Sequence, residues 1–203
     1  MNESEQHKAA MKELQAKHRE RKRELRDPDR GLVLIHTGNG KGKSSSAFGV
    51  IIRALGWGHR VGVVQFIKGK WKTGEREFFK HLDDAVGTVD WFTMGDGFTW
   101  DTQDKDADTK AAEAAFTRAR AMLSGGDYEL VVLDEINIAL RYGYLSAEAV
   151  EQGLEDRSQN TSVILTGRDA PERLCAYADL VSEINEVKHP FKAGIRAQRG
   201  IDF

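Results

Sequence analysis

A short segment rich in glycine and lysine carries the clearest chemical signal in this chain. Its residues are Thr37, Gly38, Asn39, Gly40, Lys41, Gly42, Lys43 and Ser44. They match the phosphate-binding pattern G-x-x-x-x-G-K-[ST] except at the first position, where Thr37 replaces glycine. Glycines let backbone N–H groups turn towards phosphate oxygens, and a helix that follows adds partial positive charge at its N-terminus. The segment therefore predicts a binding site for a nucleoside triphosphate.

Two lysines and a serine of this segment have side chains suited to a triphosphate and its metal ion. Lys43 can reach the terminal phosphates, Lys41 adds a second cation, and the Ser44 hydroxyl can bind Mg²⁺. Ser45 follows in the expected helix, whereas Arg53 could face either the nucleotide or solvent. We treat both as nucleotide-binding candidates. The alternative is a glycine-rich turn without a ligand, but the apolar run before the segment and the helical pattern after it favour phosphate binding.

A pair of acidic residues ends a second apolar run and forms a candidate metal site. Asp134 and Glu135 follow residues 130–133, which read Leu-Val-Val-Leu. In phosphate-loop enzymes, an acid at the end of such a buried strand holds Mg²⁺ directly or through water. Taken alone, the acids could instead stabilise the start of a helix. Together with the phosphate-binding segment they favour Mg²⁺, with Mn²⁺ as a substitute.

Two aromatic residues, Phe98 and Trp100, lie in a stretch rich in glycine and aspartate. Large rings in long loops usually fill part of the core. The alternative is that they face a flat, apolar ligand in a crevice. The local pattern leaves both interpretations open.

Strands and helices alternate from Gly31 onward, and this alternation predicts the fold that positions these residues. Runs rich in Val, Ile and Leu predict strands at about 31–36, 61–66, 87–93, 129–134, 162–166 and 179–184. Apolar residues at helical spacing predict helices around 47–55 and 112–123. The pattern predicts a three-layer α/β fold of the RecA-like P-loop NTPase type, a mostly parallel six-stranded sheet with helices on both faces. Loops at the carboxyl ends of the strands form the ligand crevice of such a sheet, and the candidate residues lie there.

Residues 1–28 form a charged N-terminal segment that we separate from the phosphate-loop domain, residues 29–203. Residues 3–26 are nearly all polar and contain no glycine or proline, a composition that favours a helix. This helix has few apolar side chains, so it cannot anchor strongly to a core. It is either a solvated tail or a helical arm that acts as a lid over a site. Asp27 precedes Pro28, and a residue before proline avoids the helical conformation.

The composition excludes several classes of protein. A formal net charge of −2 gives no general attraction to nucleic acid. No apolar stretch approaches the roughly 20 residues needed to span a bilayer, and the charged N-terminal segment is unlike a secretory signal. Cys175 is the only cysteine, which excludes an internal disulfide and a multi-cysteine zinc site. We therefore expect a cytoplasmic protein that binds neither nucleic acid nor membrane.

Short motifs follow one another in a fixed order from about Gly31 to Phe203. After the phosphate-binding segment come VQFIKG at 64–69, GFTWDTQ at 97–103, LDE at 133–135, TGR at 166–168, KH at 188–189 and GIRAQRGID at 194–202. This series resembles the P-loop corrinoid adenosyltransferases, also called cob(I)yrinic acid a,c-diamide adenosyltransferases. One phosphate-binding segment is unspecific, whereas the ordered series is specific. Ser44 stands where many members carry threonine, and both residues provide a hydroxyl.

The resemblance implies transfer of the 5′-deoxyadenosyl group of ATP to a Co(I) corrinoid with release of triphosphate, in adenosylcobalamin biosynthesis or salvage. It implies a cytoplasmic homodimer, and a flavoprotein or another electron donor as a partner. The triphosphate would lie in reverse along the loop, with C5′ facing cobalt. Because Co(I) is itself a strong nucleophile, the enzyme needs positioning and charge stabilisation rather than a general base.

By the same resemblance, Lys41 and Lys43 stabilise the leaving triphosphate together with Mg²⁺. Phe98 and Trp100 would lie at the lower face of the corrinoid, exclude its lower axial ligand and ease reduction of Co(II). The N-terminal arm would close over the corrinoid, in its own or in the partner subunit. Two other classes are alternatives: a kinase or ATPase that transfers the γ-phosphoryl group, and a nucleotide-dependent binding protein without turnover.

Overall fold

The structure is a computed structural model that describes residues 2–67, 73–82, 87–93 and 105–202. Its centre is a sheet of six strands in the order β3-β2-β4-β5-β1-β6, and every pair of neighbours runs parallel. The strands are β1 Val33–Thr37, β2 Val61–Gln65, β3 Val89–Thr93, β4 Leu130–Asp134, β5 Ser162–Thr166 and β6 Leu180–Glu183. Each overlaps its predicted range, which confirms the α/β fold of the P-loop NTPase type.

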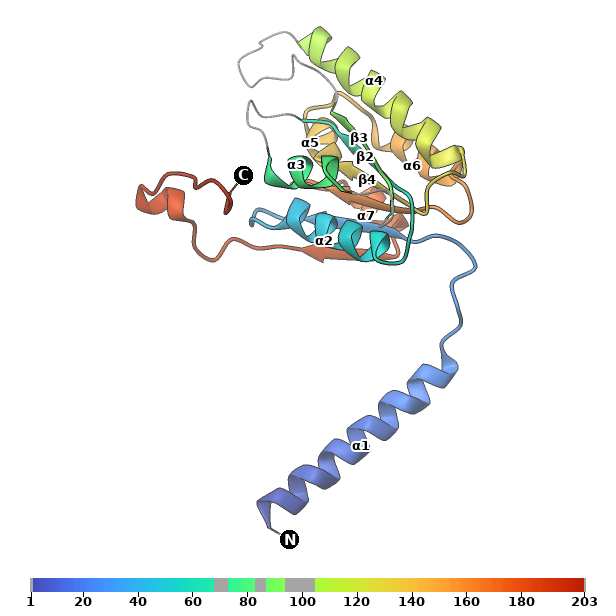
Figure 1. Ribbon diagram of the computed structural model, residues 1–203, viewed down its shortest axis with the longest axis vertical. Coiled ribbons are helices and arrows are strands. Elements are labelled where there is room, and N and C mark those ends of the chain that lie inside the picture. Colours follow the sequence, from blue (N-terminus) through green and yellow to red (C-terminus); the bar gives the residue numbers. More distant parts are fainter. Residues whose placement is uncertain (1, 68–72, 83–86, 94–104, 203) are drawn as a thin grey trace.

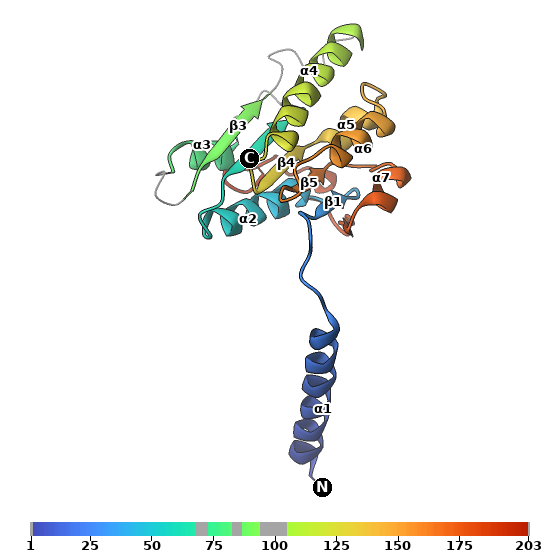
Figure 2. The same ribbon diagram turned by 90° about the vertical axis from the view of Figure 1, so that its right-hand side faces the viewer.

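Helices cover both faces of this sheet (Figures 1 and 2). One face carries α2, Lys43–Leu55, and α3, Gly74–Lys80. The other carries α4 Lys105–Ser124, α5 Ile136–Arg141, α6 Ala147–Glu155 and α7 Glu172–Tyr177. Both predicted helices, around 47–55 and 112–123, lie within α2 and α4. Within the described part of the chain, no helix is long and apolar enough to cross a bilayer.

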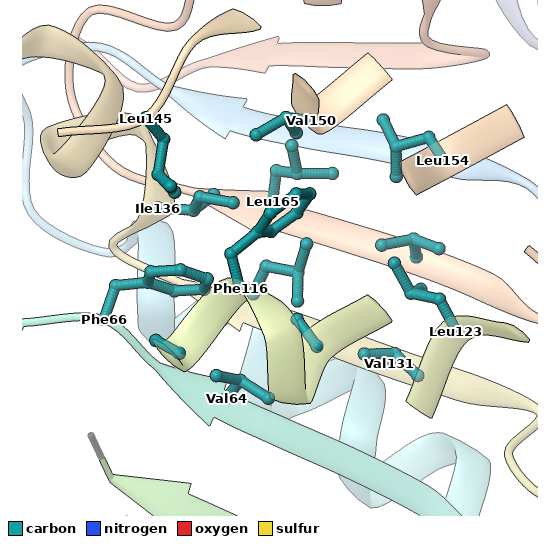
Figure 3. Close-up of a cluster of buried hydrophobic side chains, with 14 of the residues drawn as sticks. Val64, Phe66, Phe116, Leu123, Val131, Ile136, Leu145, Val150, Leu154 and Leu165 are labelled. Carbon is teal, nitrogen blue, oxygen red and sulfur yellow. The ribbon is translucent and has the colours of Figure 1, made fainter. Parts of the chain in front are cut away.

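The buried strands direct alternate side chains to the two helical layers, because side chains along a strand alternate between faces. Val131 and Leu133 of β4 belong to the cluster under α4, whereas Leu130 and Val132 belong to the cluster under α2. Figure 3 shows the larger cluster, in which Phe116 of α4 reaches towards the strands. Burial on both faces accounts for the apolar runs that predicted these strands. The core thereby fixes the strand ends that carry the site.

The two ends of the chain lie outside this core. Helix α1, Glu3–Glu24, projects away from the sheet in both views (Figures 1 and 2). Asn2 caps it, because its side chain accepts a hydrogen bond from the Glu5 amide and the Glu5 side chain accepts one from the Asn2 amide. Met11 and Leu14 are exposed, as a helix without an apolar face leaves them. After β6 the chain forms a short 3₁₀ helix, η2 Pro190–Ala193, and turns back towards the sheet.

Candidate functional site

The carboxyl ends of the strands surround a pocket of about 720 Å³. The loop after β1 contributes Gly40, Lys41 and Gly42 to its wall, and the start of α2 contributes Lys43, Ser44 and Ser45. Asp134 and Glu135 at the end of β4 line the same pocket. The structure thus brings the two lysines, the serines and the acids together, as a parallel sheet does at this edge.

The phosphate-binding loop lies directly against the segment that follows β6. The Ile184 amide donates a hydrogen bond to the Thr37 carbonyl at 2.8 Å, and the Gly40 amide donates one to the Ile184 carbonyl at 2.7 Å. A Cβ atom on Gly38 or Gly40 would lie 2.5 or 2.8 Å from that carbonyl oxygen. Gly38 also has a φ of 94°. These two glycines are therefore needed for packing against the chain as well as for the turn.

Lys43 is the first residue of α2 and is buried, with its ammonium group donating to the Gly40 carbonyl. Burial lowers the pKa of Lys43, and the nearby Glu135 carboxylate opposes this effect. A buried cation at a helix N-terminus provides strong attraction for an anion that enters the pocket. This arrangement suits the terminal part of a polyphosphate.

Asp134 is 2% exposed and is held by side chains from neighbouring strands. The Thr166 hydroxyl donates to Asp134 Oδ1 at 2.8 Å, and Gln65 Nε2 donates to Oδ2 at 3.0 Å. Burial raises the pKa of Asp134, while hydrogen bonds to Thr166, Ser44 and Gln65 oppose the rise. The contact with Ser44 joins the predicted hydroxyl and carboxylate ligands in one place.

Glu135 adopts a left-handed backbone conformation with φ of 60°, which is uncommon for a residue other than glycine. Its amide donates to the Thr166 hydroxyl at 2.9 Å, which holds this turn at the end of β4. Burial, followed by repulsion from Asp134, raises the pKa of Glu135 to about 7. Strain and desolvation of this kind are characteristic of functional sites.

The candidate metal ligands in this pocket are the hydroxyl and carboxylate oxygen atoms of Ser44, Asp134 and Glu135, and Mg²⁺ prefers such oxygen ligands. Among the described residues, no group of three or more His, Cys, Asp and Glu side chains forms a metal site by itself. Mg²⁺ commonly needs only one or two carboxylates, because substrate phosphates and water supply the other ligands. Ser44, Asp134 and Glu135 fit that requirement.

Other predicted residues lie elsewhere. The Thr37 hydroxyl accepts a hydrogen bond from the Ala170 amide at 3.1 Å, so it ties the loop to the turn after β5. Asn39 is exposed. Arg53 is exposed in the last turn of α2, at the far end of the helix from the pocket, and the structure does not bring it to the site. Phe98 and Trp100 lie outside the described residues.

Several pocket residues were not identified from the sequence. Gln65 ends β2 beside Asp134, with which it is in register. Arg168 lies in the turn after β5, and Arg141 ends α5 and pairs with Asp169 at 2.8 Å. Asp202 comes from the C-terminal segment. Gln65 lies at the end of one predicted strand and Arg168 just after another, and both belong to quoted motifs; strand ends converge at the crevice, so this position was the available signal.

The chain is similar to known proteins over its whole length. Residues 29–203 match the family described as ATP:corrinoid adenosyltransferase BtuR/CobO/CobP. The chain belongs to this family. A corrinoid adenosyltransferase of Pseudomonas aeruginosa is 48% identical over the full length of both chains. Those of Sinorhizobium sp. and Escherichia coli K12 are 47% and 45% identical, over 86% of this chain and 81% and 87% of theirs.

The ATP:corrinoid adenosyltransferase family region coincides with the sheet, its helices and the C-terminal segment. It begins after α1, in the linker that leads to β1. The phosphate-binding loop, the acidic pair and the C-terminal wall of the pocket therefore all belong to the family region. The resemblance inferred from the ordered motifs is confirmed.

Proposed function

We propose that this chain transfers the 5′-deoxyadenosyl group of ATP to the cobalt of a Co(I) corrinoid, in adenosylcobalamin biosynthesis or salvage. The observation that carries the proposal is the pocket that joins the phosphate-binding loop to Asp134 and Glu135, in a member of the ATP:corrinoid adenosyltransferase family. ATP and the corrinoid are the substrates. The product contains a new cobalt–carbon bond, and inorganic triphosphate leaves.

In this reaction the cobalt electron pair forms the bond to C5′ while the C5′–oxygen bond breaks. The electron pair of the broken bond goes to the triphosphate, so negative charge increases on the leaving group. Lys41, Lys43 and the amides of the loop lie where they can stabilise that charge. No group has to remove a proton, because Co(I) is the nucleophile. Positioning of C5′ and stabilisation of triphosphate are the tasks of the protein.

Mg²⁺ would be held by Ser44, Asp134 and Glu135, with Mn²⁺ as a substitute. When bound, it neutralises part of the phosphate charge. Asp134 is preorganised for this role by Thr166 and Gln65. Burial raises the pKa of Glu135 to about 7, so Glu135 would have to be in its carboxylate form to hold the metal. The triphosphate lies in reverse along the loop, so that C5′ faces the corrinoid.

Phe98 and Trp100 are assigned to the lower face of the corrinoid, where they exclude the lower axial ligand. Replacing both with alanine should slow the reaction that starts from Co(II) and reductant more than the reaction of preformed Co(I). The electronic spectrum of the enzyme with ATP and Co(II) corrinoid provides the direct measurement. A four-coordinate species in the wild-type protein that is lost in the double variant supports the assignment, and equal loss from both starting states contradicts it.

A homodimer is also proposed, and the edge strand β6 supports it. All four residues of β6 are exposed, and Leu180 and Val181 are each 44% exposed. Exposed edge strands are usually protected, and a second copy can pair with the same edge about a twofold axis.

We further propose that residues 1–28 form an arm that covers the corrinoid. A flavoprotein or another electron donor would reduce the corrinoid to Co(I). We also propose that the protein works in the cytoplasm. The free thiol of Cys175 suits that compartment.

Product analysis tests the proposed reaction. Wild-type protein is incubated with Mg²⁺, ATP and chemically reduced Co(I) corrinoid under anoxic conditions. We expect inorganic triphosphate and a light-sensitive organocobalt product in equal amounts. A kinase or ATPase would release ADP instead, and a binding protein would release no product. Formation of ADP without an organocobalt product would overturn the proposal.

A further inference from the structure

The C-terminal segment returns to the phosphate-binding loop after leaving the body of the protein. From β6 the chain passes the loop at Ile184, extends through η2 and turns back, so that its end lies near α3 (Figure 1). Ile201 and Asp202 then line the same pocket as the loop. We call residues 194–202 the C-terminal hook. One wall of the candidate triphosphate site is thus made by the end of the chain.

The hook places a carboxylate on a loop cation. Asp202 Oδ1 forms an ion pair with the ammonium group of Lys41. Its other oxygen, Oδ2, accepts a hydrogen bond from the Gln198 amide at 2.8 Å, and the Asp202 amide donates to the Gln198 carbonyl at 2.8 Å. The Asp202 side chain is 17% exposed. Its bond with Lys41 is the main reason that the pKa of Asp202 lies below its ordinary value, so the group is anionic at neutral pH.

This contact conflicts with a bound triphosphate. Lys41 belongs to the loop that would surround the phosphates, and a phosphate oxygen would be attracted to the same ammonium group. A carboxylate left in place beside a triphosphate would repel it, because like charges at short range are unfavourable in a partly enclosed pocket. Asp202 therefore occupies a position suited to an anionic ligand.

We propose that Asp202 is an internal competitor that triphosphate must displace from Lys41, so that the C-terminal hook opens when triphosphate binds and closes when it leaves. The inference rests on the proposed function in that the loop is taken to bind a triphosphate. It adds a residue that weakens triphosphate binding and assists release of the product. Among the described residues, the end of the hook is held by the ion pair with Lys41 and by the turn of hydrogen bonds at Gln198.

The size of the effect follows from competition within one molecule. A competitor lowers apparent affinity by the fraction of molecules in which the site is free. A partly exposed ion pair is weak, so removing its negative charge should raise the affinity for triphosphate about fivefold. If Asp202 instead held Lys41 in the position that binds triphosphate, removing the charge of Asp202 would weaken triphosphate binding.

Titration calorimetry with inorganic triphosphate and Mg²⁺ tests the proposal on the full chain. Asp202→Asn should bind triphosphate about fivefold more tightly than the wild type. Glu186→Gln is the matched control, because Glu186 also lies after β6 and forms an ion pair, but its partner is Lys192. The control should bind as the wild type does. Unchanged or weaker binding by Asp202→Asn, with the melting temperature preserved, would overturn the proposal.

Hydrogen exchange provides a second measurement in the wild-type protein. The amides of Ile201 and Asp202 donate to the Gln198 carbonyl in the closed hook. Addition of triphosphate should accelerate their exchange, and slower exchange would contradict opening of the hook. Neither measurement uses adenosyl transfer. If the chain binds triphosphate but forms no organocobalt product, the proposed function is wrong while the proposed role of Asp202 still holds. If Asp202→Asn does not bind triphosphate more tightly although turnover occurs, only the proposed role of Asp202 is wrong.

Discussion

At the two ends of the parallel sheet, the pKa values of acidic side chains are shifted in opposite directions. At the amino ends, Asp90 accepts hydrogen bonds from the Tyr128 hydroxyl at 2.8 Å and from Arg60 at 2.7 Å. Burial raises the pKa of Asp90, but the bonds to Tyr128 and Arg60 outweigh it and lower the pKa overall. At the carboxyl ends, burial raises the pKa of both Asp134 and Glu135. The amino-end acid is stabilised in its charged form, and the carboxyl-end acids are not.

A second acid at the amino ends follows the same pattern. Asp179 accepts two hydrogen bonds from Arg30, at 2.8 and 2.7 Å, and one from the Val33 amide at 2.8 Å. The bond to Arg30 is the main reason that the pKa of Asp179 is lowered. Charges that are fully paired support the fold, whereas charges left partly uncompensated around a pocket are available to a ligand. The amino edge therefore contributes stability and the carboxyl edge contributes binding.

The largest expected effect comes from removing Lys43 at the carboxyl edge. Lys43→Ala should lower kcat/KM about a hundredfold or more, because it removes charge that stabilises the leaving triphosphate. Stability should change little, since burial already disfavours the ammonium group. Arg60→Ala is the matched control at the amino edge and should lower the melting temperature while retaining activity. A large loss of activity in the control would break the distinction between the two edges.

Removing the charge of Glu135 should affect activity and stability in opposite directions. The pKa of Glu135 rises from 4.5 to about 7 on folding, so its contribution to stability is full below pH 4.5 and is lost as pH rises through 7. Glu135→Gln has no such loss, and above pH 7 the metal-free variant should be more stable than the wild type by about 3 kcal/mol. Its activity should fall about tenfold or more, as Mg²⁺ binding weakens. Urea unfolding between pH 4.5 and 8 in a chelator measures the first effect, and a parallel pH dependence in both proteins would contradict it.

The smallest effect is expected at the amino edge. Asp90→Asn should cost about 1–2 kcal/mol of unfolding free energy at neutral pH, because bonds to Tyr128 and Arg60 weaken. Since the pKa of Asp90 is lowered from 3.8, this contribution is present above that pH and is lost as pH falls through the folded value. Activity should stay at the wild-type level. Equal stability of the two proteins at pH 7 would show that the ion pair contributes nothing.

Some parts of the site followed from the sequence because their signals are local. The phosphate-binding loop combines a strand, glycines and a helix start within a few residues, and the structure places Lys41, Lys43 and Ser44 as expected around the pocket. Asp134 and Glu135 could be connected with them because parallel strands end at the same edge. Arg53 was a weaker inference, since helical spacing alone did not indicate which way it faced.

The sequence by itself determined the alternation of strands and helices, the family and the position of the phosphate-binding loop. Each depends on residues that are close together along the chain or on the order of short motifs. Only the tertiary structure decided that Gln65 and Thr166 hold Asp134, that Ile184 requires glycine at 38 and 40, and that Asp202 reaches Lys41. These contacts join residues far apart in the sequence, and their geometry depends on sheet order and on the path of the chain after β6. Local patterns predict the helices and strands, whereas packing decides which distant side chains form hydrogen bonds and ion pairs with one another.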